Sequence, residues 1–441
     1  MLLSKRAVCF YILFSLINSS YAQDSSRDEQ RFNLHFQTTY IYQYKPSLHS
    51  PYEGANSLAG RKERQNSLTA TLYLGARLWQ GAELYINPEV AGGSGLSGAL
   101  GMAGSSNGET FRVGDPAPTL YVGRFFLKQT FALNSNKEWQ ASDANQLSGM
   151  IPKNHLSIYL GKFSLGDLFD NNEYSNSART QFMNWSLMNN GAWDYAANLR
   201  GYTYSFSTEW QLDKMSYKVA LATLPKVANG EKLNTRFRDS FAIAVNAEIG
   251  RAYTVNSKKG NVRLLGYYND ANMGNYKEAN RMNGVPEIVS TRKLGRTRWG
   301  WGINFDQELS QTTGLFGRLG WNNGKNETWA FTEIDRTASL GASFNGSNWI
   351  RKDDIAGVAF VLNGLAEDHR NYLAKGGTGF MIGDGALNYG VEAISEWYYN
   401  YKPSVNLPLW LTGDYQFCLH PGYNKDRGPA HIFSIRVHTE F

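Results

Sequence analysis

The final eleven residues of the chain, 431–441, constrain its fold more than any other segment. Their side chains alternate in character from one residue to the next. The apolar set is Phe433, Ile435, Val437, Thr439 and Phe441, and the polar set is Ser434, Arg436, His438 and Glu440. Because successive side chains of a β-strand point to opposite sides, this segment predicts a strand with one apolar face and one charged face.

Similar alternation recurs along the chain between clusters of Gly, Asn, Asp and Pro. The clearest segments are 71–78, 83–90, 155–160, 298–306 and 407–417. A soluble β-sandwich could alternate in the same way. The last strand, however, ends the chain on the aromatic Phe441, as the closing strand of bacterial outer-membrane barrels does. We therefore predict an all-β fold, a transmembrane antiparallel β-barrel with its apolar face toward lipid and its polar face toward the lumen.

The amino-terminal residues predict export. Lys5 and Arg6 precede an apolar stretch, Ala7 to Ile17, and Ser20-Tyr21-Ala22 resembles a cleavage site before Gln23. The apolar stretch is too short for a membrane-spanning helix, and Cys9 lacks the motif for lipidation. We expect a signal peptide at residues 1–22 and one barrel domain at residues 23–441, so any membrane span must consist of strands.

Composition agrees with a barrel. Aromatic residues make up 14% of the chain, with 26 Tyr and 12 Trp, and no linker-like segment divides it. Tyr and Trp concentrate at the two membrane interfaces of barrels. The formal net charge of +6 is too small and dispersed to indicate nucleic-acid binding, although it would bias a pore slightly toward anions. Cys418 is the only cysteine beyond the signal segment, which excludes an intramolecular disulfide.

Several long stretches also resemble the carbohydrate-selective porins of the OprB type. They are Phe36-Gln37-Thr38-Thr39, residues 46–52, Leu74-Gly75-Ala76-Arg77-Leu78-Trp79, residues 81–89, 92–98, 107–112 and 161–167, Arg179-Thr180-Gln181-Phe182-Met183-Asn184-Trp185, Gly191-Ala192-Trp193-Asp194-Tyr195 and Arg200-Gly201-Tyr202. One departure is Ala196, where the family leads us to expect Pro. The resemblance implies roughly sixteen antiparallel strands and passive diffusion of sugars across the outer membrane.

A sugar pore needs polar groups for hydroxyls and aromatic rings for C–H faces, each binding weakly enough for release. Alternation places five charged side chains toward the lumen: Arg77, Glu83, Glu89, Arg124 and Lys128. Arg77, Glu83 and Glu89 are the strongest candidates, because their strands look paired as a hairpin across residues 79–81. Any of these charges could instead merely solvate the wall.

The segment between Asp167 and Arg200 is unusually long for a connection, and its Trp185, Trp193 and Tyr195 argue against disorder. We expect it to fold back into the lumen, which makes Trp185 and Trp193 further candidates for the pore constriction. An external cap is the alternative.

Three other patterns have simpler explanations. Residues 93–98 match G-x-G-x-x-G, but no buried strand precedes them as a dinucleotide site requires. His155-Leu156-Ser157 resembles the His-x-Ser of outer-membrane phospholipases, but Leu156 and not a nucleophile would face the lipid. The acidic stretch 167–173 lacks the spacing and glycine of an EF-hand. We therefore expect no catalytic residues, no metal and no cofactor.

The sequence thus predicts a sugar-selective porin that contacts sugars and outer-membrane lipid and does not bind nucleic acid. A general non-selective porin, a lipid-acting enzyme and a surface receptor remain alternatives. The identity of the sugar, the exact strand count and association into a homo-oligomer stay open.

Overall fold

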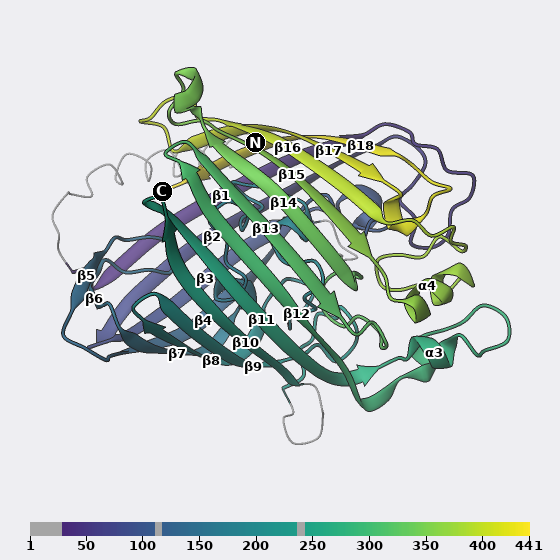
Figure 1. Cartoon of the computed structure of the whole chain (residues 1–441), viewed down its shortest axis with the longest axis horizontal. Coiled ribbons are helices and arrows are strands. Elements are labelled where there is room, and N and C mark those ends of the chain that lie inside the picture. The colour runs from purple at the N-terminus through teal and green to yellow at the C-terminus, as the bar shows by residue number, and fades with distance from the viewer. Residues whose placement is uncertain (1–28, 111–116, 236–242) are drawn as a thin grey trace, which may run out of the picture.

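A computed structural model describes residues 29–110, 117–235 and 243–441, and within them the strands form a closed antiparallel barrel. Sixteen strands close the ring, each hydrogen-bonded to its neighbours in the order β1-β18-β17-β16-β15-β14-β13-β12-β11-β10-β9-β8-β7-β4-β3-β2 (Figure 1). A separate two-stranded sheet pairs β5 with β6. The predicted barrel of roughly sixteen strands is therefore confirmed.

The strand bounds are β1 Phe32–Lys45, β2 Glu63–Trp79, β3 Ala82–Gly92, β4 Thr119–Ala132, β5 Lys137–Gln140, β6 Gly149–Pro152, β7 His155–Phe163, β8 Thr203–Leu212, β9 Met215–Thr223, β10 Ile243–Val255, β11 Lys258–Met273, β12 Lys293–Ser310, β13 Thr313–Asn322, β14 Arg336–Asn345, β15 Ile355–Gly364, β16 Glu392–Tyr401, β17 Leu409–Leu419 and β18 Ala430–Glu440. The α-helices are α2 Trp185–Met188, α3 Tyr276–Ala279 and α4 Glu367–Ala374. None of the helices in the described part of the chain is long and apolar enough to cross a membrane. The predicted signal peptide, residues 1–22, lies outside the described residues.

The last strand closes the barrel against the first, as its alternation predicts. Gln37 of β1 pairs with Glu440 of β18, and the backbones of Phe36 and Phe441 exchange hydrogen bonds of 2.7 and 2.9 Å. The rings of the two phenylalanines lie 5.3 Å apart between centroids. The carboxyl-terminal residue therefore takes part in the seam.

The predicted two faces of each strand are present. On β12, Arg298, Asn304 and Asp306 are buried in the interior, whereas Trp299 and Trp301 are exposed on the outer wall. The outer face of the barrel also carries exposed Leu, Ile, Val and Phe side chains on most strands. The outside of the barrel is therefore apolar and its interior polar, which is the pattern of a membrane barrel.

The two ends of the barrel differ in the length of their connections. At the end where β18 finishes, several strands are joined by two-residue turns, 80–81, 213–214, 256–257 and 311–312; we call this the short-turn end. Asn256 and Ser257 both have positive φ, 49° and 63°, as a type I′ hairpin turn requires. At the opposite, long-loop end, the connections include 164–202 and 365–391 and carry α3 and α4 (Figure 1). Residues 402–408 join β16 to β17 at the short-turn end. The alternating segment predicted at 407–417 therefore begins two residues too early, because Leu407 lies in this connection and β17 starts at Leu409.

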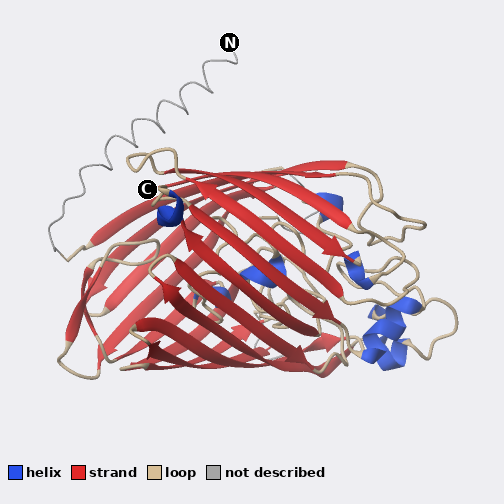
Figure 2. Ribbon diagram, turned by 45° about the horizontal axis from the view of Figure 1, so that its top comes forward, coloured by secondary structure: helices blue, strands red, loops and turns tan. Residues whose placement is uncertain are grey.

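Several long loops turn back into the barrel instead of projecting from it. Figure 2 shows short helical segments surrounded by the strands. The loops contribute side chains that are almost fully buried, among them Phe182, Trp193 and Trp329. The lumen is therefore mostly filled, and the space that remains is defined by loops as well as by the wall.

Candidate functional site

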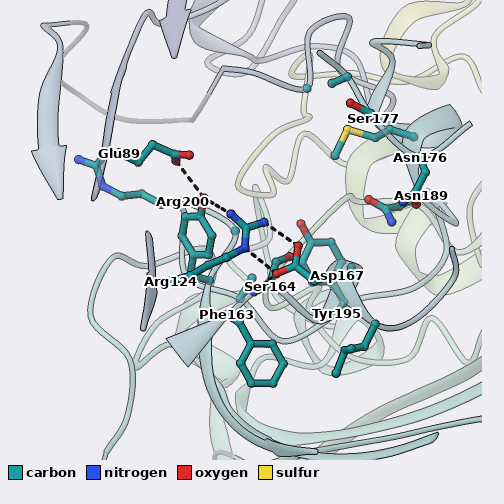
Figure 3. Close-up of a pocket in the computed structure, with 18 of the residues that line it drawn as sticks. Glu89, Arg124, Phe163, Ser164, Asp167, Asn176, Ser177, Asn189, Tyr195 and Arg200 are labelled. Atoms are coloured by element: carbon teal, nitrogen blue, oxygen red, sulfur yellow. Dashed lines mark hydrogen bonds and ion pairs between the residues drawn. The ribbon is translucent and has the colours of Figure 1, made fainter. Parts of the chain in front are cut away.

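A cavity of about 720 Å³ lies in the lumen. Its wall side is formed by β1, β2, β3, β4 and β7, and its inner side by residues 164–202, which we call the inward loop. Figure 3 shows Glu89 and Arg124 of the wall together with Asp167 of the inward loop. The expectation that the segment Asp167 to Arg200 folds back into the lumen is thus confirmed. The cavity is the candidate site of selection.

Buried charges on the far wall hold the inward loop in place. Arg318 of β13 donates to the carbonyl of Leu187 at 2.7 Å and pairs with Asp170 at 2.9 Å. Arg436 of β18 donates to the carbonyl of Gln181 at 2.7 Å. Both arginines are essentially inaccessible to solvent, so these partners offset the cost of burying their charge.

A second loop, residues 93–110, packs against the inward loop and the far wall. The carboxylate of Glu392 on β16 accepts hydrogen bonds from the backbone N–H groups of Ala103 and Gly104, at 3.0 and 2.8 Å. The carbonyl of Asn107 accepts from the indole of Trp185 at 2.9 Å. The G-x-G-x-x-G pattern at residues 93–98 therefore belongs to an infolded loop in which Leu96 is buried.

Glu89 is the centre of a polar network on the cavity wall. Its carboxylate accepts hydrogen bonds from Thr71 at 2.5 Å and from the hydroxyl of Tyr202 at 2.9 Å, as well as from the hydroxyl of Tyr121. It also forms an ion pair of 3.1 Å with Arg179 of the inward loop. Glu89 therefore ties three strands to the loop at one point.

Arg179 lies between two carboxylates. Its Nε atom is 2.8 Å from Glu109, in addition to the pair with Glu89. Burial disfavours the charged guanidinium, but Glu109, Tyr73 and Glu89 outweigh this and hold the pKa of Arg179 well above its ordinary value. Arg179 is thus a permanent positive charge fixed in the lumen.

Arg124 joins the wall to the start of the inward loop. Its Nε and Nη2 atoms donate to Asp167 at 2.7 and 2.6 Å, a bidentate pair (Figure 3). Its guanidinium also lies 5.2 Å from the centroid of the Tyr202 ring. The geometry of Arg124 is consequently fixed from two sides.

Arg200 contributes a cation that is less engaged. Its guanidinium lies 4.2 Å above the ring of Tyr121. No carboxylate of the described residues forms an ion pair with it. Its donors are therefore not committed to a salt bridge within the described residues.

Aromatic rings from both sides complete the lining. On the wall, Phe126 and Phe163 contact each other edge to face at 5.5 Å between centroids. On the inner side, Phe331 stacks on Trp185 at 5.4 Å and contacts Tyr195 at 4.6 Å. These rings offer apolar faces next to the charged groups.

The structure places the predicted site residues in three locations. Glu89, Arg124, Lys128 and Trp185 line the cavity. Arg77 and Glu83 do not line it; they pair with each other at 3.5 Å near the short-turn end.

Trp193 lies in the packed interior behind the cavity. It is 1% exposed, and its indole N–H donates to Asn246 at 2.9 Å. Ala196, the departure from the expected proline, is fully buried in the same apolar cluster. This position suits a packing role for Trp193 and gives it no contact with a passing solute.

Several lining residues were not among the pore-constriction candidates predicted from the sequence, namely Tyr73, Glu109, Asp143, Asn145, Tyr159, Phe163, Asp167, Arg179, Tyr195, Arg200 and Tyr202. Four of them lie within the segment Asp167 to Arg200, so the expectation that this segment enters the lumen was itself the available signal. Residues of the acidic stretch 167–173 and of the His155-Leu156-Ser157 pattern have contacts within the barrel. Asp167 and Asp170 are paired with Arg124 and Arg318, and Ser157 hydrogen-bonds Thr130 at 2.9 Å.

The charges in the lining balance one another. Four cations, Arg124, Lys128, Arg179 and Arg200, accompany the carboxylates Glu89, Glu109, Asp143 and Asp167. A balanced set of fixed charges gives many hydrogen-bond donors and acceptors without a strong preference for ions of one sign. Together with the aromatic faces, it suits a neutral molecule rich in hydroxyls.

Comparisons with known proteins agree with the barrel fold. The model of a family described as carbohydrate-selective porin, OprB family, matches residues 55–441. The high-pH structure of OprB from Pseudomonas putida has a TM-score of 0.67 and 16% sequence identity, over 93% of this chain and 94% of that one. The outer-membrane channel DcaP of Acinetobacter baumannii has a TM-score of 0.51 and 10% identity, over 93% and 97% of the two chains. No curated protein matches the chain.

Proposed function

The chain belongs to the carbohydrate-selective porins of the OprB family, and we propose that it selects sugars at the cavity between the inward loop and the wall formed by β1 to β4 and β7. A member of this family is a channel and not an enzyme, and it carries sugars across the bacterial outer membrane. Since such barrels have short periplasmic turns, the short-turn end faces the periplasm and the long-loop end faces the exterior.

One observation carries the proposal: a fixed polar network and two groups of aromatic rings meet in a single cavity. Glu89 and Asp167 hold Arg179 and Arg124 in place from opposite sides. A sugar can donate to the carboxylates and accept from the guanidinium groups, while its C–H faces pack on the rings. Because the groups are already positioned, little ordering of side chains is needed when the sugar binds.

Arg200 is the residue that we expect to contact the sugar most directly. It has donors that are not committed to a carboxylate of the described residues, and the ring of Tyr121 supports its plane. Water competes for the same donors in the lumen, so binding stays weak enough for release. A sugar therefore crosses the cavity by exchanging hydrogen bonds with water and the lining residues, as passive diffusion requires.

The test is conductance of the purified protein in a planar bilayer, with a series of neutral sugars added. We expect sugars to lower ion conductance by occupying the cavity, and Arg200→Gln to raise the half-blocking sugar concentration several-fold. Arg281→Gln is the matched control, because Arg281 is exposed in a long-loop-end connection and does not line the cavity. Equal sugar block in both variants would contradict the role of Arg200, and indifference of the wild-type channel to every sugar would contradict selection at this cavity.

The outer wall supports a second part of the proposal, contact with outer-membrane lipid. Exposed side chains such as Phe206, Leu264 and Phe360 form an apolar surface that would be costly to leave in water. The alternative is that further copies of the chain cover part of this surface in a homo-oligomer. Mass measurement of the detergent-solubilised protein, with and without cross-linking, distinguishes a lipid-covered monomer from a homo-oligomer.

A further inference from the structure

One connection at the periplasmic end departs from the short turns around it. Residues 133–154, between β4 and β7, contain the separate β5–β6 sheet; we call this segment the periplasmic excursion (Figure 1). The part between β5 and β6, residues 141–148, reaches the underside of the cavity. Asp143, Ala144, Asn145 and Gln146 are part of the cavity lining. The same cavity is thus bounded by loops from opposite ends of the barrel.

The tip of the excursion is a closed turn. The backbones of Asp143 and Gln146 exchange hydrogen bonds of 3.0 Å in each direction. Asn145 has a φ of 56°, a left-handed conformation that asparagine tolerates better than most residues. The turn therefore presents its side chains in a defined arrangement.

Lumen-facing side chains of the first strands hold this turn from the wall. Asn33 of β1 donates to the carbonyl of Gln146 at 2.8 Å, and Asn87 of β3 donates to the side-chain oxygen of Asn145 at 2.9 Å. His35 lies 2.9 Å from the hydroxyl of Ser142. A turn with this many side-chain contacts to the wall is fixed in the lumen.

The base of the turn is also held by hydrogen bonds. Two residues predicted for the constriction, Arg77 and Glu83, take part in them. Arg77 donates to the carbonyl of Ser148 at 3.1 Å. The hydroxyl of Tyr85 donates to Glu83 at 2.8 Å and accepts from the backbone N–H of Leu147 at 3.2 Å. Leu147 itself is fully buried. Arg77 and Glu83 thus support the excursion, whereas Glu89 supports the inward loop.

We propose that the periplasmic excursion forms a second filter for neutral sugars at the exit of the cavity, with Asp143 as its specificity-determining hydrogen-bond acceptor. This inference rests on the proposed function, because it assigns the exit of the same sugar path. The turn bounds the cavity on the side opposite the long-loop end. Asp143 lines the cavity there, and its Oδ1 atom accepts a hydrogen bond of 2.7 Å from the backbone N–H of Ala144. A sugar leaving the arginines meets an acceptor for its hydroxyls before it reaches the periplasm.

The narrowing is tested by shortening the turn while leaving the barrel strands intact. Replacing residues 141–148 by Asn-Gly would join β5 to β6 as a tight hairpin. We expect a higher single-channel conductance, and a several-fold faster entry of trisaccharides relative to monosaccharides in liposome swelling. An unchanged conductance and size limit in a variant that retains heat-modifiable mobility on gels would overturn the filter.

The role of Asp143 is tested by Asp143→Asn, which keeps the size of the side chain and removes its charge. Asp213→Asn is the matched control, because Asp213 lies in the β8–β9 turn at the same end and does not line the cavity. We expect a several-fold weaker sugar block for Asp143→Asn alone. Equal block in the two variants would overturn the role of Asp143, and this readout does not depend on whether the shortened chain folds.

Failure of this inference and failure of the proposed function give different results. If sugars block the wild-type channel and Arg200→Gln weakens that block, the proposed function stands whatever the excursion variants show. If no sugar blocks the wild-type channel, the proposed function fails. A higher conductance of the shortened variant would then show only that the excursion narrows the path of ions.

Discussion

Arg124 donates two hydrogen bonds to Asp167, of 2.7 and 2.6 Å, and so connects strand β4 to the first turn of the inward loop. Asp167 also accepts from the backbone N–H of Ser164 at 3.1 Å. The carboxylate therefore orients the arginine and the loop at once. Because Arg124 also lines the cavity, the shape of the loop and the position of a group that we propose contacts the sugar are coupled.

Arg124→Gln tests this coupling. A charge-assisted hydrogen bond contributes about 1.5–3 kcal/mol, although water in the lumen replaces part of it. We expect a several-fold rise in the half-blocking sugar concentration and a changed single-channel conductance, both measured in planar bilayers. Arg124→Lys keeps the charge but cannot form the bidentate pair, so we expect an intermediate result. A variant that behaves like the wild type in both measurements would contradict the coupling.

Arg318→Ala tests the anchoring of the inward loop. The change leaves Asp170 buried without its cation and removes the hydrogen bonds that Arg318 donates to the carbonyls of Leu187 and Ser175. Removing one partner of a buried ion pair costs about 3–5 kcal/mol, because the remaining charge is left uncompensated. We expect a larger and noisier channel conductance, while the barrel remains heat-modifiable. A single-channel conductance with the size and noise of the wild type would show that other contacts suffice to hold the loop.

The barrel could be predicted from the sequence because its signal is local. The alternation at 431–441 encodes which face of β18 meets lipid, and the same period of two recurs on β2, β3, β7, β12 and β17. The closing of β18 on β1 followed from the aromatic at Phe441 and is confirmed by the exchange of backbone hydrogen bonds with Phe36. The lipid environment forces this regularity on every strand, so one sequence suffices to detect it.

The site was harder to predict because it depends on which loops enter the lumen. Glu83 and Glu89 share one face of β3, but six residues of a strand span about 20 Å. They therefore serve different loops, Glu83 the periplasmic excursion and Glu89 the inward loop. The partner of Glu89, Arg179, lies ninety positions away in sequence, and no local pattern marks such a pair.

The amino terminus of the mature protein remains a prediction. The charged, apolar and small-residue pattern of residues 1–22 predicts cleavage after Ala22. Mass spectrometry of the protein from outer membranes should place its first residue at Gln23. Retention of residues 1–22, or an acylated Cys9, would contradict a cleaved signal peptide.

Removal of Phe441 tests the seam. The residue contributes the last backbone hydrogen bonds between β18 and β1 and a ring contact with Phe36. We expect a marked decrease of the heat-modifiable form in outer membranes, measured by gel mobility with and without boiling. Phe441→Tyr, which keeps both the backbone and the ring, should assemble normally. Equal assembly of the truncated chain would show that the seam closes without its final residue.

The two tryptophans predicted for the constriction give the sharpest test of the site, because the structure places them differently. Trp185 lines the cavity and stacks on Phe331, whereas Trp193 is buried against Phe169 and Tyr195. Trp185→Ala should weaken sugar block several-fold with little loss of folded protein, because it removes an aromatic face from the path.

Trp193→Ala should act through stability. Truncating a buried tryptophan costs about 3–5 kcal/mol and leaves the acceptor of Asn246 without its donor. We expect a lower yield of heat-modifiable barrel, with the channels that do form retaining the wild-type half-blocking sugar concentration. If Trp193→Ala weakened sugar block in well-folded protein and Trp185→Ala did not, this result would contradict the proposal that sugars pass through this cavity. The measurement therefore decides which aromatic group a passing sugar contacts.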